Sequence, residues 1–300
     1  MLSIASNKCA VSHDRHRCSI GAGSMICGLV SNCWATQLTQ NESLESLIAR
    51  AVESGFEAVE LRQGSLGACE DAQQIPDPDL LARLATRFPE VRFNVAISIG
   101  FLSIDLCPDD PLFAAACQAA GAVTGTAGPH LRLVDLHTTA EHCAAANTSQ
   151  VAANLARLAG VLSDRGGRLS VEHSLQPWGP FFDIFTAARG QLGTAADCLQ
   201  LCFDPCNLLF PGDQIDPLEV TGSLDPETVS MIHFKQRQGG QVLDRMASGE
   251  LDWQALGECI VQQGFDCPGL FEIAPGAQVW SALESSRAYL QGLGIPLDSR

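Results

Sequence analysis

The chain has 300 residues, 46% of them hydrophobic and 17% charged, which is enough to enclose a large core in one α/β domain or two smaller ones. Its formal net charge of −16 argues against a nucleic-acid-binding protein, since phosphate binding needs concentrated Lys and Arg. No apolar run reaches the about 18 residues of a membrane span, so neither nucleic acid nor a membrane is expected as a partner. The thirteen cysteines are scattered and form no CxxC pair, which predicts reduced thiols in a cytoplasmic protein.

Residues 1–24 lack the apolar region of a signal peptide. They contain two cysteines and two histidines whose spacing matches no standard zinc motif. We therefore expect a disordered or loosely packed N-terminal extension over residues 1–24 and a single domain over residues 25–300.

From residue 25 onward, short apolar runs bounded by turns alternate with helix-patterned segments. The runs predict strands at 25–34, 58–62, 93–99, 130–136, 169–174, 199–207, 230–236 and 269–273. Helical spacing predicts helices at 42–54, 77–87, 111–122, 149–165, 181–191, 253–263 and 281–293, with a short turn at 225–229. Eight strand-and-helix units of this length predict an α/β protein with a single (β/α)8 barrel. A doubly wound sheet is the alternative, but no GxGxxG follows the first strand.

Four predicted strands in the last third of the chain each carry one acidic or imidazole side chain near their C-terminal ends. These side chains are Glu172, Asp204, His233 and Glu272. Such groups are costly to bury in an apolar run unless they are paired or bound to a metal. Three carboxylates and one imidazole suit a divalent cation with open positions for substrate oxygens, and catalytic groups of a barrel lie at this end of its strands. The alternatives are structural ion pairs for the glutamates and a turn cap for Asp204.

Alternation within the strands places further polar residues on the lumen side of the barrel. Glu60 and Arg62 share one face of the 58–62 strand, Arg132 lies on the inner parity of its strand, and Lys235 shares the parity of the imidazole two residues before it. We expect Glu60 and Arg62 to contact substrate, with a paired lumen charge as the alternative. Trp34 can stack on a sugar face, with core packing as the alternative.

The C-terminal half resembles the xylose-isomerase-like barrel superfamily, in particular its sugar phosphate isomerase/epimerase branch. The resemblance rests on five motifs that occur in the family's order at barrel spacing, and more weakly on ESGFEAVELR. These motifs are VEHS, FDPCNLLFPGD, IHFKQ, SGELDW and GFDCPGLFEI. The resemblance implies that the four residues Glu172, Asp204, His233 and Glu272 hold one divalent ion, namely manganese, magnesium, cobalt or zinc. Gln236 stands where the family pattern has aspartate, and Asn207 matches the members with a D-P-x-N motif.

The activity implied by this resemblance is that of a metal-dependent sugar isomerase or epimerase. In the family's epimerases the two glutamates, here Glu172 and Glu272, remove and return a proton beside a carbonyl, while the metal stabilises the enediolate. Lys235 matches the lysine of the H-x-K motif and is a third catalytic candidate, and Asn207 is a substrate-binding candidate. The expected partner is a small-molecule sugar or polyol, and barrels of this class often pair as homodimers. A lyase that dehydrates an inosose or a dehydroshikimate-like acid, and a non-catalytic sugar-binding member, are the alternatives.

Overall fold

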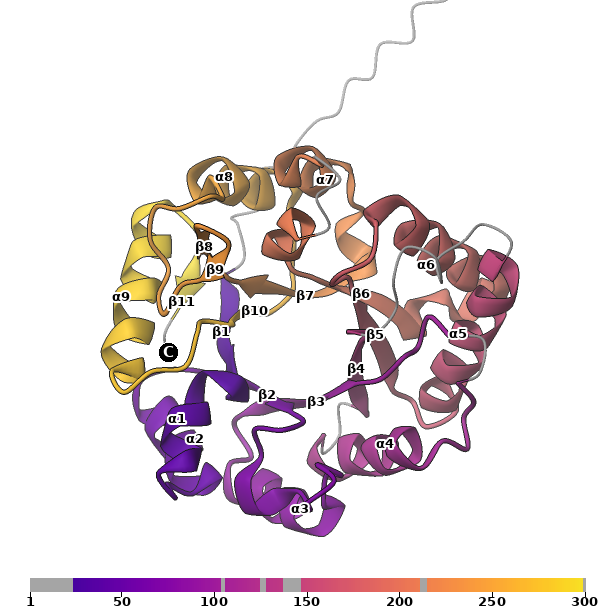
Figure 1. Ribbon diagram of the computed structural model, residues 1–300, viewed down its shortest axis with the longest axis horizontal. Coiled ribbons are helices and arrows are strands. Elements are labelled where there is room, and N and C mark those ends of the chain that lie inside the picture. Colours follow the sequence, from indigo (N-terminus) through magenta and orange to yellow (C-terminus); the bar gives the residue numbers. More distant parts are fainter. Residues whose placement is uncertain (1–23, 104–105, 125–127, 137–146, 211–214, 299–300) are drawn as a thin grey trace, which may run out of the picture.

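Eight parallel strands close into a barrel that helices surround (Figure 1). The computed structural model describes residues 24–103, 106–124, 128–136, 147–210 and 215–298. The barrel strands are β1 (Met25–Val30), β2 (Ala58–Arg62), β3 (Arg92–Ser98), β4 (His130–Val134), β5 (Arg168–Glu172), β6 (Leu199–Phe203), β7 (Val229–Phe234) and β10 (Gly269–Phe271). They pair in sequence order, and β10 pairs with both β7 and β1. This closure confirms the predicted (β/α)8 barrel and excludes an open doubly wound sheet.

Helices cover the outside of the barrel on every side (Figure 1). The described α-helices are α1 (Ala35–Thr39), α2 (Leu44–Glu53), α3 (Pro78–Arg87), α4 (Pro111–Val123), α5 (Thr148–Ser163), α6 (Trp178–Leu192), α7 (Pro217–Ser223), α8 (Trp253–Gln263) and α9 (Val279–Gly292). Short 3-10 helices occupy Ser31–Trp34, Gly67–Cys69, Gly193–Cys198, Pro205–Leu209 and Pro226–Thr228. A small hairpin, β8 (Arg237–Gln238) with β9 (Gln241–Val242), follows β7, and β11 (Leu297–Asp298) pairs with the start of β1.

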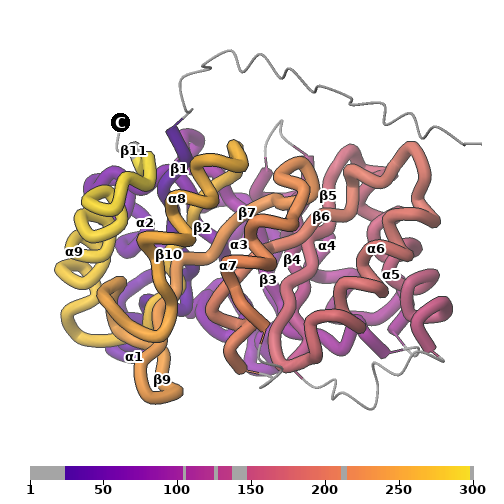
Figure 2. The backbone as a smooth tube through the Cα atoms, turned by 90° about the horizontal axis from the view of Figure 1, so that it is seen from above, coloured from indigo at the N-terminus to yellow at the C-terminus, as the bar shows by residue number. Residues whose placement is uncertain are grey.

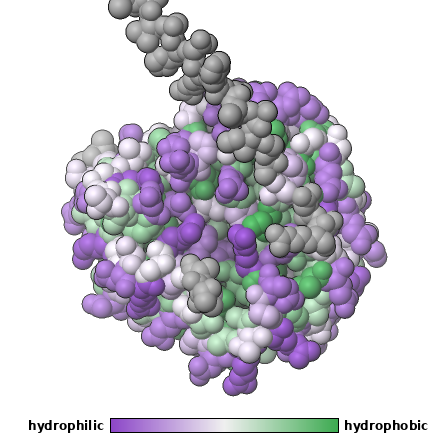
Figure 3. All heavy atoms as spheres, turned by 180° about the vertical axis from the view of Figure 1, so that it is seen from behind, coloured by the Kyte–Doolittle hydropathy of each residue, from purple (hydrophilic) through white to green (hydrophobic). Residues whose placement is uncertain are grey.

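The two ends of the barrel differ in what they carry. The side view places β11 at one end and β9 at the other (Figure 2). The end opposite the hairpin, where the strands begin, has a rim rich in hydrophilic side chains (Figure 3). A cavity of about 920 Å³ opens there, with Arg92, His130 and Arg168 among its lining residues.

Aspartate followed by proline begins several of the helices. Asp77, Asp110 and Asp216 are N-caps whose side chains accept hydrogen bonds from backbone N–H groups two residues ahead. Proline fits the first helical position because its ring fixes a helical φ and no N–H is needed there. The same device follows β6, where Asp204 caps the 3-10 helix Pro205–Leu209 and so is held at the barrel rim.

The hydrophobic core lies in two places. The larger part fills the layer between strands and helices, and a smaller cluster lies apart from it. The members of the smaller cluster are Val30, Ala58, Cys202, Met231 and Leu270. Gly28 and Gly269 allow the barrel to close, because a Cβ on Gly28 would lie 2.6 Å from the Ala58 carbonyl oxygen and one on Gly269 would lie 2.3 Å from the Phe234 ring.

The sequence-based elements differ from the structure in several places. The first strand ends at Val30, and residues 31–34 form a 3-10 helix instead. The short helices α1 and α7 were not predicted. The expected extension over 1–24 lies outside the described residues, except for Ser24. The ten cysteines of the described ranges are free thiols, and none of the helices in those ranges has both the length and the apolar character to cross a membrane.

Candidate metal centre

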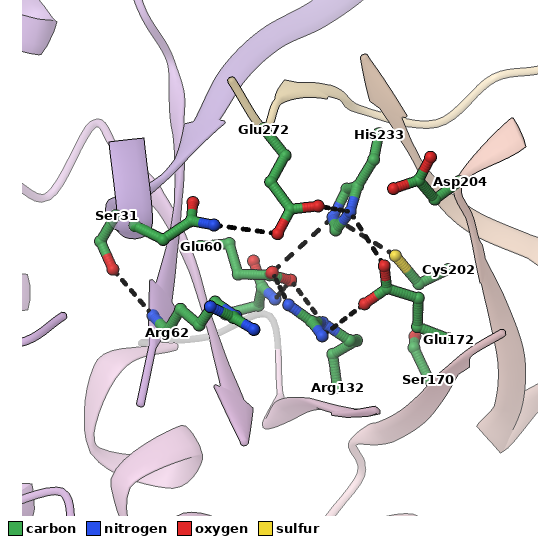
Figure 4. Close-up of polar contacts among 12 residues, drawn as sticks. Ser31, Glu60, Arg62, Arg132, Ser170, Glu172, Cys202, Asp204, His233 and Glu272 are labelled. Atoms are coloured by element: carbon green, nitrogen blue, oxygen red, sulfur yellow. Dashed lines mark hydrogen bonds and ion pairs between the residues drawn. The ribbon is translucent and has the colours of Figure 1, made fainter. Parts of the chain in front are cut away.

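Glu172, Asp204, His233 and Glu272 meet at the C-terminal end of the barrel strands (Figure 4). Glu172 ends β5, His233 lies in β7, and Asp204 and Glu272 directly follow β6 and β10. One ligand-type atom from each lies within 4.8 Å of the others, and all four side chains are buried. A single cation with ligand bonds of about 2.0–2.6 Å can therefore reach all four. The structure brings the predicted ligand set together.

The imidazole of His233 presents its two ring nitrogens to different surroundings. Nδ1 lies 3.5 Å from Glu172 Oε1 and 3.4 Å from Glu272 Oε2, and no hydrogen bond to Nδ1 is formed within the described ranges. Nε2 lies 3.3 Å from the Sγ atom of Cys202. Burial lowers the pKa of His233, but Cys202 and the Glu172 carboxylate raise this pKa well above its ordinary value. The direction of this shift favours the protonated ring when no cation occupies the Nδ1 side.

The two carboxylate oxygens of Asp204 make different contacts. Its Oδ1 accepts a hydrogen bond of 2.9 Å from the backbone N–H of Cys206, which is the capping role considered as an alternative. Its Oδ2 lies 2.5 Å from Lys235 Nζ. Burial raises the pKa of Asp204, and the Lys235 ammonium opposes that rise. Capping and site formation are thus compatible, because each uses a different oxygen.

Lys235 lies within the carboxylate cluster rather than at its edge. Nζ is 2.6 Å from Glu272 Oε2, in addition to its contact with Asp204, and it donates a hydrogen bond of 3.2 Å to Asn207 Oδ1. Burial lowers the pKa of Lys235, but Asp204 and Glu272 raise it well above its ordinary value. The side chain is therefore a buried ammonium group that bridges two of the candidate ligands.

Each of the two glutamates is held by an amide. Asn207 Nδ2 donates to Glu172 Oε1 at 3.0 Å, and Asn32 Nδ2 donates to Glu272 Oε1 at 3.0 Å. Burial raises the pKa of Glu172, but the Arg132 guanidinium and His233 together outweigh burial and hold this pKa at about 2. Burial acts on Glu272 in the same way, and Lys235 and His233 hold its pKa well below the ordinary range. Both glutamates are ionised at neutral pH.

The donor set and its charge fit a divalent cation. Among the described side chains buried here, four carboxylates face two permanent cations. The carboxylates are Glu60, Glu172, Asp204 and Glu272, and the cations are Arg132 and Lys235. With His233 neutral, two negative charges remain, which one divalent ion balances. The imidazole atom His233 Nδ1, buried without a hydrogen bond, is a further sign of a missing ligand partner.

The predicted substrate contacts divide into two groups. Arg62 is partly buried beside the site, and Asn207 contacts Glu172 and Lys235, so both lie where a ligand could meet them (Figure 4). Glu60 is fully buried and pairs with Arg132, which matches the alternative of a paired lumen charge. Trp34 is fully buried against Trp280, with 5.9 Å between ring centroids, and belongs to the core. The structure therefore corrects the expectation that Glu60 and Trp34 contact substrate.

Three residues of the site were given no role in it at the level of sequence. Arg132 had a usable signal, since an arginine on the inner parity of an apolar strand must find a buried anion. Asn32 lies in a 3-10 helix that was predicted as strand, so its reach to Glu272 could not be anticipated. Cys202 resembles any other buried cysteine until His233 is placed 3.3 Å away.

Gln236, the departure from the family pattern, points away from the candidate ligands and is fully buried. Its Nε2 donates to the carbonyl oxygens of Ala247 and Leu251, each at 3.0 Å. Its Oε1 accepts from the backbone N–H of Arg237 at 2.9 Å and of Leu251 at 3.1 Å. Gln236 therefore holds the segment that leads into α8. Its difference from the family's aspartate affects the hydrogen bonds of this loop and does not affect the four candidate ligands.

Comparison with known proteins yields the fold. No protein-family model and no curated protein matches the sequence. A structure of the IOLI protein with a bound zinc atom is similar at a TM-score of 0.67 and 12% identity, covering 92% of this chain and 100% of that one. D-allulose 3-epimerase from Methylomonas sp. in complex with D-allulose gives 0.62 and 13%, with 90% and 97% covered. The probable 3-DHS dehydratase AsbF from Bacillus anthracis gives 0.65 and 13%, with 89% and 99% covered.

At 12–13% sequence identity, these structural similarities show the fold alone. A xylose isomerase domain protein is among the proteins with the same fold. The chain therefore has the fold of the xylose isomerase-like (β/α)8 barrels.

Proposed function

We propose that the protein is a sugar isomerase or epimerase that depends on a divalent metal and moves a proton at a carbon next to a carbonyl. The observation that carries the proposal is the placement of two ionised glutamates around one nitrogen. Glu172 and Glu272 approach His233 Nδ1 from different sides, at 3.5 and 3.4 Å (Figure 4). A substrate carbon between them would have a proton acceptor on each side, as an epimerisation requires.

The residues of the site would have separate roles. Glu172, Asp204, His233 and Glu272 would hold the cation, which as a Lewis acid lowers the cost of charge on a carbonyl oxygen. Glu172 and Glu272 would take and return the proton. Lys235, a buried ammonium beside Glu272, would donate a hydrogen bond to a substrate oxygen. Arg62 and Asn207 would orient substrate hydroxyls at the mouth.

Two of the structural neighbours support the proposal, one for the substrate class and one for the metal. One of them was solved with D-allulose bound and another with zinc, although neither closely matches this sequence. D-allulose and related unphosphorylated ketoses are therefore suitable first probes, and zinc and manganese are suitable first metals.

The test is exchange of the substrate C–H proton with solvent deuterium. Metal-loaded protein should exchange it, chelator-treated protein should not, and Glu272→Gln should slow it by about 10²–10⁴-fold. Glu284→Gln, an exposed glutamate on α9, is the matched control and should exchange normally. Undiminished exchange in Glu272→Gln would show that this carboxylate does not move the proton.

A lyase is the second candidate, because the buried Lys235 ammonium could assist the departure of a hydroxyl group. The structural neighbour described as a probable 3-DHS dehydratase makes dehydroshikimate-like acids a reasonable probe. Such a reaction releases water and extends the conjugation of the product, which changes its ultraviolet absorbance, whereas isomerisation of a ketose creates no such chromophore. Ultraviolet absorbance during turnover therefore separates the two candidates.

A further inference from the structure

A chain of buried charged groups crosses the barrel lumen beside the candidate ligands. Arg132, on β4, is 1% exposed. Its Nε donates to Glu60 Oε2 at 3.3 Å, and its Nη2 donates to Glu60 Oε1. Its Nη1 donates to Glu172 Oε2 at 2.5 Å. Asn94 completes the chain by donating to Glu60 Oε2 at 2.7 Å.

The guanidinium determines how Glu172 presents its two oxygens. Oε2 is engaged by Arg132, which leaves Oε1 facing His233 Nδ1. Glu60 holds Arg132 through two nitrogens at once, so the planar guanidinium cannot rotate away (Figure 4). The Oε1 atom of Glu60 also lies 3.7 Å from His233 Nε2. This nitrogen is the one that does not face the candidate cation position. One ion pair therefore adjoins two of the four candidate ligands.

Stability of the fold does not by itself explain this ion pair. Replacing a buried ion pair by apolar side chains of similar size is often neutral or stabilising, because two charges must lose their water. Small apolar side chains already occur close by in the same lumen, such as Ala58 and Cys202. Arg132 is also too deeply buried to touch a substrate.

We propose that Arg132 is a positioning residue for the metal centre, and that Glu60 locks Arg132 in place. The inference rests on the proposed function, since it assigns Arg132 to the orientation of a ligand in that site. Groups that orient metal ligands typically contribute about 10–100-fold to metal affinity. A lysine at position 132 keeps the positive charge but has one nitrogen, so it cannot bridge Glu60 and Glu172 in the same geometry.

The experiment measures the dissociation constants of Mn²⁺ and Zn²⁺ for the metal-free full chain, by competition with a fluorescent chelator. Arg132→Lys should raise both constants by about 10–100-fold. Glu60→Gln should raise them in the same direction, because the lock on the guanidinium is weakened. Urea denaturation of each metal-free protein gives its free energy of unfolding as a second readout.

Arg189→Lys is the matched control, because Arg189 is a partly buried structural arginine that donates to the backbone carbonyls of Ala196 and Leu199. It should lower the free energy of unfolding and leave both dissociation constants unchanged. A folded Arg132→Lys protein with wild-type constants overturns the positioning role, as does an equal loss of affinity in Arg189→Lys. A wild-type chain that binds neither ion overturns the proposed function together with this inference.

Discussion

Lys235 and the proposed divalent cation would use the same carboxylate oxygens. Its Nζ lies 2.5 Å from Asp204 Oδ2 and 2.6 Å from Glu272 Oε2, so its charge opposes a second cation close by. Two unit charges about 4 Å apart interact by about 4 kcal/mol at an effective dielectric of about 20. The ammonium would therefore lower metal affinity, and without a cation it compensates the buried charge of the two carboxylates.

We expect Lys235→Met to tighten binding of Mn²⁺ by about tenfold or more, because the repulsion is lost. The same substitution should lower the stability of the metal-free protein, since two buried carboxylates lose their counter-ion. Competition titration with a chelator and urea denaturation measure the two effects. Arg245→Met, which removes an exposed arginine paired with Asp244, should change neither. Weaker metal binding in Lys235→Met would contradict the expectation that the Lys235 ammonium opposes the cation.

His233 links the site to pH. The pKa of its ring is raised above the ordinary value, which favours the protonated ring in the metal-free protein. A cation at Nδ1 requires the neutral ring, and binding must release that proton.

Metal affinity should therefore rise with pH, by up to about tenfold per unit while the pH stays below the pKa of His233. Dissociation constants measured at pH 6, 7 and 8 test this slope, and calorimetry in two buffers of different ionisation enthalpy counts the released proton. Constants that stay level across this range would mean that His233 does not bind the cation in its neutral form.

At the scale of elements, the turn after β7 shows how a single side chain can hold a loop. The Gln236 side chain makes four hydrogen bonds to the backbone of residues 237–251, two as donor and two as acceptor. Gly249 allows the close approach, because a Cβ there would lie 2.4 Å from the Gln236 side chain. An aspartate, as in the family pattern, offers no donors and is one methylene shorter.

Gln236→Asp should therefore lower the free energy of unfolding by about 2–4 kcal/mol, through unsatisfied carbonyls and a buried charge. Metal affinity should change much less, because the side chain points away from the ligands. Urea denaturation followed by tryptophan fluorescence gives the first quantity. Gln238→Asp, in the exposed hairpin, is the control and should be nearly neutral. Unchanged stability in Gln236→Asp would mean that the loop is supported by other contacts.

The regular elements were largely predictable, and the short irregular ones were not. Strands such as β2 and helices such as α3 have apolar periodicity over their full length, and their ends agree with the structure within one residue. The helices α1 and α7 span 5 and 7 residues, too few for a 3.6-residue period to show. The run 25–34 was predicted as one strand, although Ser31–Trp34 forms a 3-10 helix.

At the scale of the whole molecule, strand order alone was enough to gather the candidate ligands. In a closed parallel barrel the C-terminal ends of all strands meet at one rim, so polar groups there must face one another. The ion pairs across the lumen were not predictable, because they depend on the strand register and on which carboxylate oxygen each cationic group contacts. Glu60 shows the difference, since its inward parity was expected and its partner Arg132 was not.

The proposed centre consists of one cation held jointly by residues of four strands, and metal stoichiometry tests this most directly. Chelator-treated protein, dialysed against Mn²⁺ or Zn²⁺ and assayed by elemental analysis, should contain one divalent ion per chain. His233→Gln and Glu272→Gln should each weaken binding by more than about 100-fold, beyond the effect of an orienting neighbour, and Glu284→Gln should retain full binding. A chain that binds no ion, or one that binds equally well in both ligand variants, would contradict the shared site.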